Sequence, residues 1–150
     1  LPLIDPPGDL ETRIVACEDL VAVVPAAHPL AGGDEVGLGE LCRHPFVDFD
    51  LGWGTRALVD RAFLRAGLQR HTAFEVTDLG TLVDLVARGL GVALVPETIA
   101  EARPAALAVA GVVKPEICWE LVVAHLGSVD DPATPINPAA RAFLSLLPAV

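Results

Sequence analysis

The segment Asp78–Pro96, DLGTLVDLVARGLGVALVP, constrains the fold more than any other part of the sequence. Apolar residues recur at helical spacing over Leu79–Leu90, which predicts a helix with one buried face. Asp78 stands where an N-cap oxygen accepts a free backbone N–H, and Gly89 stands where a helix can end in the left-handed conformation. The apolar run Val92–Val95 is typical of a strand buried on both faces of a parallel sheet. The segment therefore predicts half of a βαβ crossover.

The residues before this segment predict two more strands with a helix between them. The strands are expected at Phe46–Phe49 and Thr72–Val76, and the helix begins at a Thr55 cap and runs to about Ala66. The order strand, helix, strand, helix, strand over residues 46–95 implies right-handed crossovers and parallel pairing. These residues therefore predict one small α/β lobe.

Four motifs in this sequence resemble, in the same order and with compatible spacing, the effector-binding domain of the LysR-type transcriptional regulators. The resemblance covers about residues 10–126. The motifs are LVARGLGVALVP at 85–96, EDLVAVVP at 18–25 followed by HPLA at 28–31, VGLGEL at 36–41 followed by PFV at 45–47, and Arg56 within a helix ending at Gly67.

The resemblance implies a type 2 periplasmic-binding-protein-like α/β fold with two lobes. By this likeness, residues 1–44 are part of the first lobe and hold a strand, the HPLA turn and a short helix. Residues 45–103 are the second lobe, complete and built on a small parallel sheet. Residues 104–150 return to the first lobe with the last strand and a C-terminal helix. The start of the first lobe and the winged helix-turn-helix of the family have no counterpart in this sequence, which we therefore expect to be truncated.

A candidate binding site follows from the two helices of the second lobe. Both begin just after a parallel strand, so their first turns should lie at the same edge of the sheet, where ligands bind such folds. Free N–H groups and the helix dipole favour an anion there. The threonines offer hydroxyls, the glycines allow close approach, and the tryptophan offers a flat wall. The candidate effector-binding residues are Trp53, Gly54, Thr55, Asp78, Gly80 and Thr81.

Charge and hydropathy limit the partners of this chain. Its net charge is −10, with 20 acidic and 10 basic residues, and no cluster of Lys or Arg offsets that balance. A surface of this kind repels nucleic acid phosphates, so we expect DNA binding only through a domain absent from this chain. No apolar run approaches the ~18 residues of a membrane span, and no leader opens the sequence, so we expect a cytoplasmic protein.

The sequence lacks the patterns typical of enzymes and metal sites. Its four histidines have no neighbouring Ser or Cys motif, and its three cysteines show no metal-ligand spacing. We therefore expect no catalytic residues, no metal and no cofactor.

The resulting hypothesis is an effector-sensing domain of a LysR-like regulator. A small organic molecule, such as a carboxylate, would bind between the lobes and act on an attached DNA-binding domain within a homodimer. One alternative is a free-standing solute-binding or regulatory module without a DNA-binding domain. A third is a small α/β enzyme with a perturbed acid or base between Asp50 and Asp78.

Overall fold

The computed structural model describes residues 10–101, 105–113, 117–127 and 135–147, which divide between two compact units. One unit is residues 18–119, and the other contains the described residues of 1–17 and 120–150. These divisions differ from the predicted boundaries at 44/45 and 103/104, the second of which lies outside the described residues. The reason for the first difference is strand pairing, because residues 20–25 pair with strands that the sequence placed in the second lobe.

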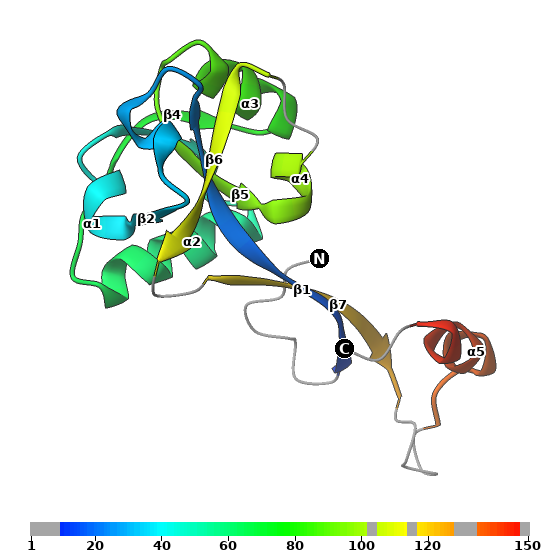
Figure 1. Ribbon diagram of the computed structural model, residues 1–150. Helices are drawn as coiled ribbons and strands as arrows, with labels where there is room; N and C mark the ends of the chain where they lie inside the picture. The colour runs from blue at the N-terminus through cyan, green and yellow to red at the C-terminus, as the bar shows by residue number, and fades with distance from the viewer. Residues whose placement is uncertain (1–9, 102–104, 114–116, 128–134, 148–150) are drawn as a thin grey trace. The chain divides into compact units, whose positions relative to one another are not determined.

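The unit of residues 18–119 contains most of the secondary structure (Figure 1). In chain order its elements are the later part of β1 (Leu10–Pro25), a short 3-10 helix at Pro29–Gly32, β2 (Glu35–Gly37), α1 (Leu38–Leu41), β3 (Pro45–Phe49), α2 (Gly54–Arg65), β4 (His71–Val76), α3 (Leu79–Ala87), β5 (Ala93–Pro96), α4 (Glu97–Glu101) and β6 (Leu107–Val113).

The strands of this unit belong to two sheets, one that contains β2, β6, β1 and β5 in that order and one formed by β3 and β4. β1 pairs antiparallel with β5 on one side and with β6 on the other, and β2 extends β6 in parallel. β3 and β4 pair in parallel, and Val92, just before β5, forms a parallel bridge with Phe46. Backbone bonds of 2.9 Å from Val47 N to Val92 O and from Val92 N to Pro45 O hold this bridge. The predicted parallel pairing over residues 46–95 is confirmed.

Two apolar cores cover opposite faces of the sheet. Successive side chains of a strand point to opposite faces, and β1 divides accordingly. Leu20, Ala22 and Val24 join the core beneath α1 and α2, whereas Val21 and Val23 join the core beneath α3 and α4. Burial on both faces explains why these strands are apolar at nearly every position.

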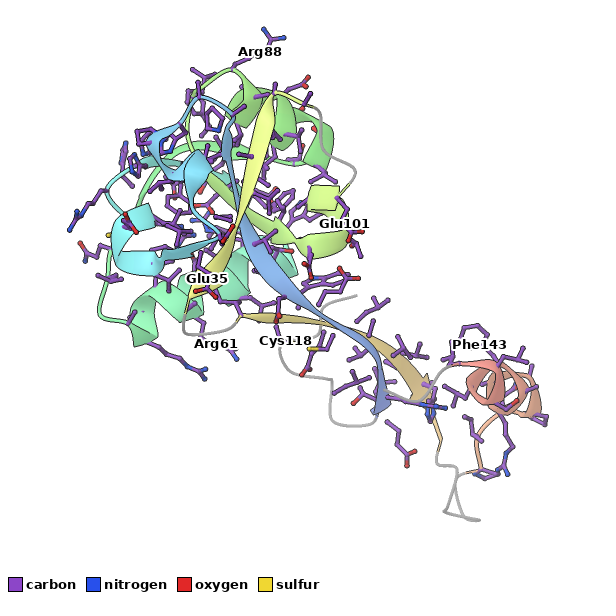
Figure 2. The ribbon with its side chains drawn as sticks, in the orientation of Figure 1. Glu35, Arg61, Arg88, Glu101, Cys118 and Phe143 are labelled. Atoms are coloured by element: carbon purple, nitrogen blue, oxygen red, sulfur yellow. The ribbon has the colours of Figure 1, made fainter. Side chains whose placement is uncertain are left out.

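The segment from α3 to β5 folds as its sequence predicts. Asp78 is the N-cap of α3, and Gly89 follows the helix with φ +80°. All four residues of β5 are buried. Arg88 is the C-cap residue, and its side chain extends away from the fold in Figure 2.

The other unit contains the start of β1, most of β7 (Cys118–Leu126) and α5 (Pro138–Leu146), and β7 pairs with β1. α5 begins after its N-cap residue Asn137, whose Oδ1 accepts from Ala139 N at 2.8 Å. On this helix Leu144 is buried, whereas Phe143 is 53% exposed (Figure 2). None of the helices in the described part of the chain has the length and hydropathy of a transmembrane span.

Candidate functional site

β3 and β4 end side by side, and this places the starts of α2 and α3 together. Phe49 pairs with Val76 at the last position of both strands, and Asp50 N donates to the Val76 carbonyl at 3.0 Å. β5 runs parallel to β3 and is followed at the same edge by α4, where Thr98 Oγ1 donates to Glu18 Oε2 at 2.7 Å. This strand-carboxyl edge therefore carries the starts of three helices.

The start of α2 combines an aromatic wall with a helix end that has no side-chain cap. Trp53 is the N-cap residue, and its side chain makes no capping hydrogen bond. Its ring instead stacks on Phe49, with centroids 4.4 Å apart and planes 12° from parallel, and remains 39% exposed. Asp50 Oδ1 accepts from Gly52 N at 3.0 Å and closes the loop between them. The N–H groups of the first turn of α2 are thus left for water or a ligand.

Thr55 does not cap α2, and the prediction that it does is wrong. The helix begins at Gly54, so Thr55 lies inside the first turn, and its side chain is only 6% exposed. Periodicity marks the apolar face of a helix better than its first residue, and here the helix begins two residues earlier than the pattern predicted. Of the two threonines proposed to offer hydroxyls, only Thr81 is exposed.

The start of α3 is closed by a side chain of its own. Asp78 Oδ1 accepts from Thr81 N at 2.8 Å, and Oδ2 accepts from Thr81 Oγ1 at 2.7 Å. Mainly because of the backbone hydrogen bond from Thr81, the pKa of Asp78 lies below its ordinary value of 3.8. A Cβ on Gly80 would lie 3.3 Å from Asp78 Oδ1, so a glycine at this position avoids a close contact with the carboxylate. This helix start presents negative charge and acceptor oxygens.

Arg56 connects these elements, although it is not among the six predicted site residues. Its Nη1 donates to the Phe49 carbonyl at 2.9 Å and to Glu75 Oε1 at 2.7 Å, and its Nε donates to Asp60 at 3.1 Å. Burial by itself lowers the pKa of Arg56, but the bonds with Glu75 and Asp60 outweigh it and raise the pKa. The i,i+4 spacing of Arg56 and Asp60 is the one sequence signal that could have indicated part of this network.

The described cavities lie beside the predicted site residues rather than at them. A shallow cavity of about 430 Å³ lies along α2 and is lined by Arg56, Asp60, Phe63, Leu64, Leu68, Gln69, Arg70 and Thr72. A second cavity, of about 230 Å³, is lined by Asp19, Leu20, Val21, Glu35, Glu97, Gly111, Val112 and Ile117. Neither includes one of the six predicted residues.

Within the described ranges, no group of three or more His, Cys, Asp or Glu side chains could hold a metal ion. Two arginines of the unit form ion pairs with carboxylates. Arg56 pairs with Asp60 and Glu75, and Arg70 pairs with Asp48 and Asp60. The edge offers hydrogen-bond donors, acceptors and an aromatic face, which is the chemistry of recognition.

A family model and the similar proteins of known sequence point to the same family. The model of the LysR substrate binding domain matches residues 1–150. The uncharacterized HTH-type transcriptional regulator YnfL of Escherichia coli K12 is 39% identical over 92 residues, which cover 60% of this chain and 31% of YnfL. The transcriptional dual regulator GltC of Bacillus subtilis 168 is 36% identical over 98 residues, which cover 65% of this chain and 33% of GltC. The chain thus spans about a third of the length of these relatives.

Solved structures agree on the fold. The effector binding domain of QuiR in complex with shikimate superposes with a TM-score of 0.79 at 24% sequence identity, covering 95% of this chain and 66% of that one. Together with the family match over the whole chain, this assigns the architecture to the periplasmic-binding-protein-like α/β fold of the LysR effector-binding domains. The chain belongs to the LysR substrate binding domain family.

Proposed function

We propose that this chain is the effector-sensing domain of a LysR-like transcriptional regulator and that its effector binds at the strand-carboxyl edge. The observation that carries the proposal is the start of α2, which has no side-chain cap and stands beside the exposed ring of Trp53. A flat apolar wall next to open backbone donors suits a small ring or chain with an anionic group.

The chemistry of the edge favours a carboxylate that also carries a hydroxyl or an amine. The open start of α2 favours the negative group, because its N–H groups and dipole attract anions. The start of α3 presents the Asp78 carboxylate, which accepts from a hydroxyl or amine and repels a second anion. Shikimate, which the QuiR domain holds, is a hydroxylated carboxylate of this class.

The partners follow from the same assignment. GltC and YnfL are transcriptional regulators, and we assign DNA binding in such a regulator to a domain separate from this acidic chain. We also propose that the regulator is cytoplasmic, that it forms a homodimer, and that this domain catalyses no reaction. The exposed apolar side chains of Leu126, Phe143 and Leu146 support self-association. Light scattering that finds a monomer at every concentration would remove the homodimer.

The first test uses Trp53 as its own reporter. The sequence contains two tryptophans, Trp53 and Trp119, so a Trp119→Phe variant leaves one fluorophore at the proposed site. We expect shikimate or a related hydroxylated carboxylate to change its emission saturably. The same ligand at about 100 times its Kd should add about 2.7 kcal/mol to the free energy of unfolding, visible as a higher Tm.

A matched pair of variants locates the site. Trp53→Ala should abolish the ligand-induced rise in Tm. Phe74→Ala is the control, because Phe74 on β4 is 40% exposed against 39% for Trp53 and lies outside the edge. Equal loss of the response in both variants, or its survival in Trp53→Ala, would place the effector elsewhere. No response to any carboxylate in the panel would count against this ligand class.

A further inference from the structure

The guanidinium of Arg56 joins three elements that surround the proposed site. It lies in the first turn of α2, and its bonds reach the last residue of β3, through the Phe49 carbonyl, and Glu75 on β4. Its bond to Asp60 holds the same side chain against α2 itself. The Arg56 side chain is 11% exposed, whereas those of its partners Asp60 and Glu75 are 42% and 49% exposed.

The bond to the Phe49 carbonyl closes the loop that carries Trp53. Residues 50–53 connect β3 to α2, and the Arg56 bond spans this loop from one end to the other at 2.9 Å. The Phe49 side chain is 4% exposed and forms the surface on which the Trp53 ring rests. Fixing the Phe49 backbone and the start of α2 together therefore fixes the angle and spacing of the two rings.

The charge of Arg56 is paired with carboxylates of the same unit. Its Nε and Nη1 are engaged by Asp60, Glu75 and the Phe49 carbonyl, and its two carboxylate partners neutralise it. An arginine beside an anion site often binds the anion directly, but the bonds of Arg56 indicate a structural role at this site.

We infer that Arg56 is a positioning residue of the effector site: it holds the Phe49–Trp53 wall in place and makes the site selective for flat ligands without touching them. The inference rests on the proposed function for its ligand, but the position of Trp53 can be measured without one. Lysine cannot replace this arginine, because an ammonium group lacks the planar fork that binds a carbonyl and two carboxylates at once.

The test compares three variants in the Trp119→Phe background, where Trp53 is the fluorophore. Arg56→Gln and Arg56→Lys remove the fork, and Arg61→Gln is the control on the exposed side of the same helix (Figure 2). Without ligand, both Arg56 variants should show red-shifted emission and stronger quenching by acrylamide. With shikimate or a related carboxylate, affinity should fall about tenfold, as expected when a charged hydrogen bond that orders the site is lost.

A fourth variant separates the carbonyl bond from the ion pair. Glu75→Gln weakens the charge interaction but leaves Arg56 its bond to Phe49, so Trp53 emission should stay close to that of the parent. If the circular dichroism spectrum shows that Arg56→Gln is unfolded, the test is decided by Arg56→Lys, which keeps the charge. Unchanged quenching in a folded Arg56 variant overturns the inference.

Ligand binding and ring position can fail separately. Altered Trp53 quenching in the Arg56 variants, together with a parent that binds no carboxylate, would support the positioning of the wall and reject the proposed ligand. A parent that binds, with Arg56 variants of unchanged affinity, would keep the proposed function and reject the role of Arg56.

Discussion

Arg70 and Asp48 form an ion pair in which each side chain is only 6% exposed, with Arg70 Nε 2.9 Å from Asp48 Oδ2. Thr72 Oγ1 donates a second bond to the same oxygen at 2.7 Å. The Arg70 guanidinium also lies over the rings of Phe46 and Phe63, 5.6 and 5.1 Å from their centroids. The pair is desolvated, so each charge depends mainly on the other, while the second partner of Arg70, Asp60, is 42% exposed.

Asp48→Ala should therefore cost up to about 3–5 kcal/mol in the free energy of unfolding, because it leaves the buried Arg70 charge with only the partly exposed Asp60 as a partner. Urea denaturation measures this loss. The exposed Asp84→Ala on α3 is the control and should stay within about 0.5 kcal/mol of the parent. The double variant Asp48→Leu/Arg70→Met removes both charges and should be more stable than Asp48→Ala. A loss below about 1 kcal/mol for Asp48→Ala would contradict the strength of this pair.

Gly91 is required by a close approach of two strands. A Cβ at this position would lie 2.7 Å from the Pro45 carbonyl oxygen and 3.2 Å from Val47 Cγ2. Gly91→Ala should therefore force β3 away from Val92 and destabilise the unit by about 1–3 kcal/mol. Gly37→Ala is the matched control, since nothing lies within 4 Å of a Cβ there. Equal melting temperatures of the two variants would refute the prediction.

Asp78 should stabilise α3 only while its carboxyl is ionised. Its pKa is lower folded than unfolded, so its contribution is complete above the ordinary value of 3.8 and is lost as the pH falls through the folded pKa. Asp78→Ala should lower Tm near neutral pH, and the difference from the parent should shrink in acid. Asp78→Ser, which keeps an N-cap oxygen, should restore part of the loss without this pH dependence. A pH-independent difference for Asp78→Ala would count against the assignment.

His28 should make the 3-10 helix at Pro29–Gly32 sensitive to acid. Its Nδ1 accepts from Leu30 N at 3.2 Å, and its ring lies 4.5 Å from the ring of His44. Burial, and then repulsion by His44, lower the pKa of His28 below 6.5. The unfolded chain therefore binds the proton more readily, and stability is complete above pH 6.5 and falls as the pH drops through that value toward the folded pKa.

His28→Asn tests this, because asparagine keeps an acceptor for Leu30 N but does not titrate. Between about pH 8 and about pH 5, Tm should fall more for the parent than for His28→Asn. Other titrating groups are shared by the two proteins and cancel in the comparison. Parallel curves of Tm against pH would show that protonation of His28 does not change the stability of the fold.

Much of the fold could be predicted because its signals are local. Asp78 caps α3 through bonds to a residue three positions away, and Gly89 ends the helix with φ +80°. The order of strands and helices over residues 46–95 implied parallel pairing, and the structure has it. Periodicity failed at Thr55, because it follows the buried face of the helix and gives little information on which residue starts it.

The candidate site divides along the same line. The sequence by itself determined that α2 and α3 begin after neighbouring strands, that Asp78 closes one of them, and that Trp53 stands before the other, because these follow from chain order and short-range capping. The tertiary structure alone decided that residues 18–44 fold with the parallel strands and that Arg56 and Arg70 bind carboxylates 19 and 22 positions away. Such pairings depend on strand register and on which side chains meet across the sheet, and a local sequence pattern contains no information about either.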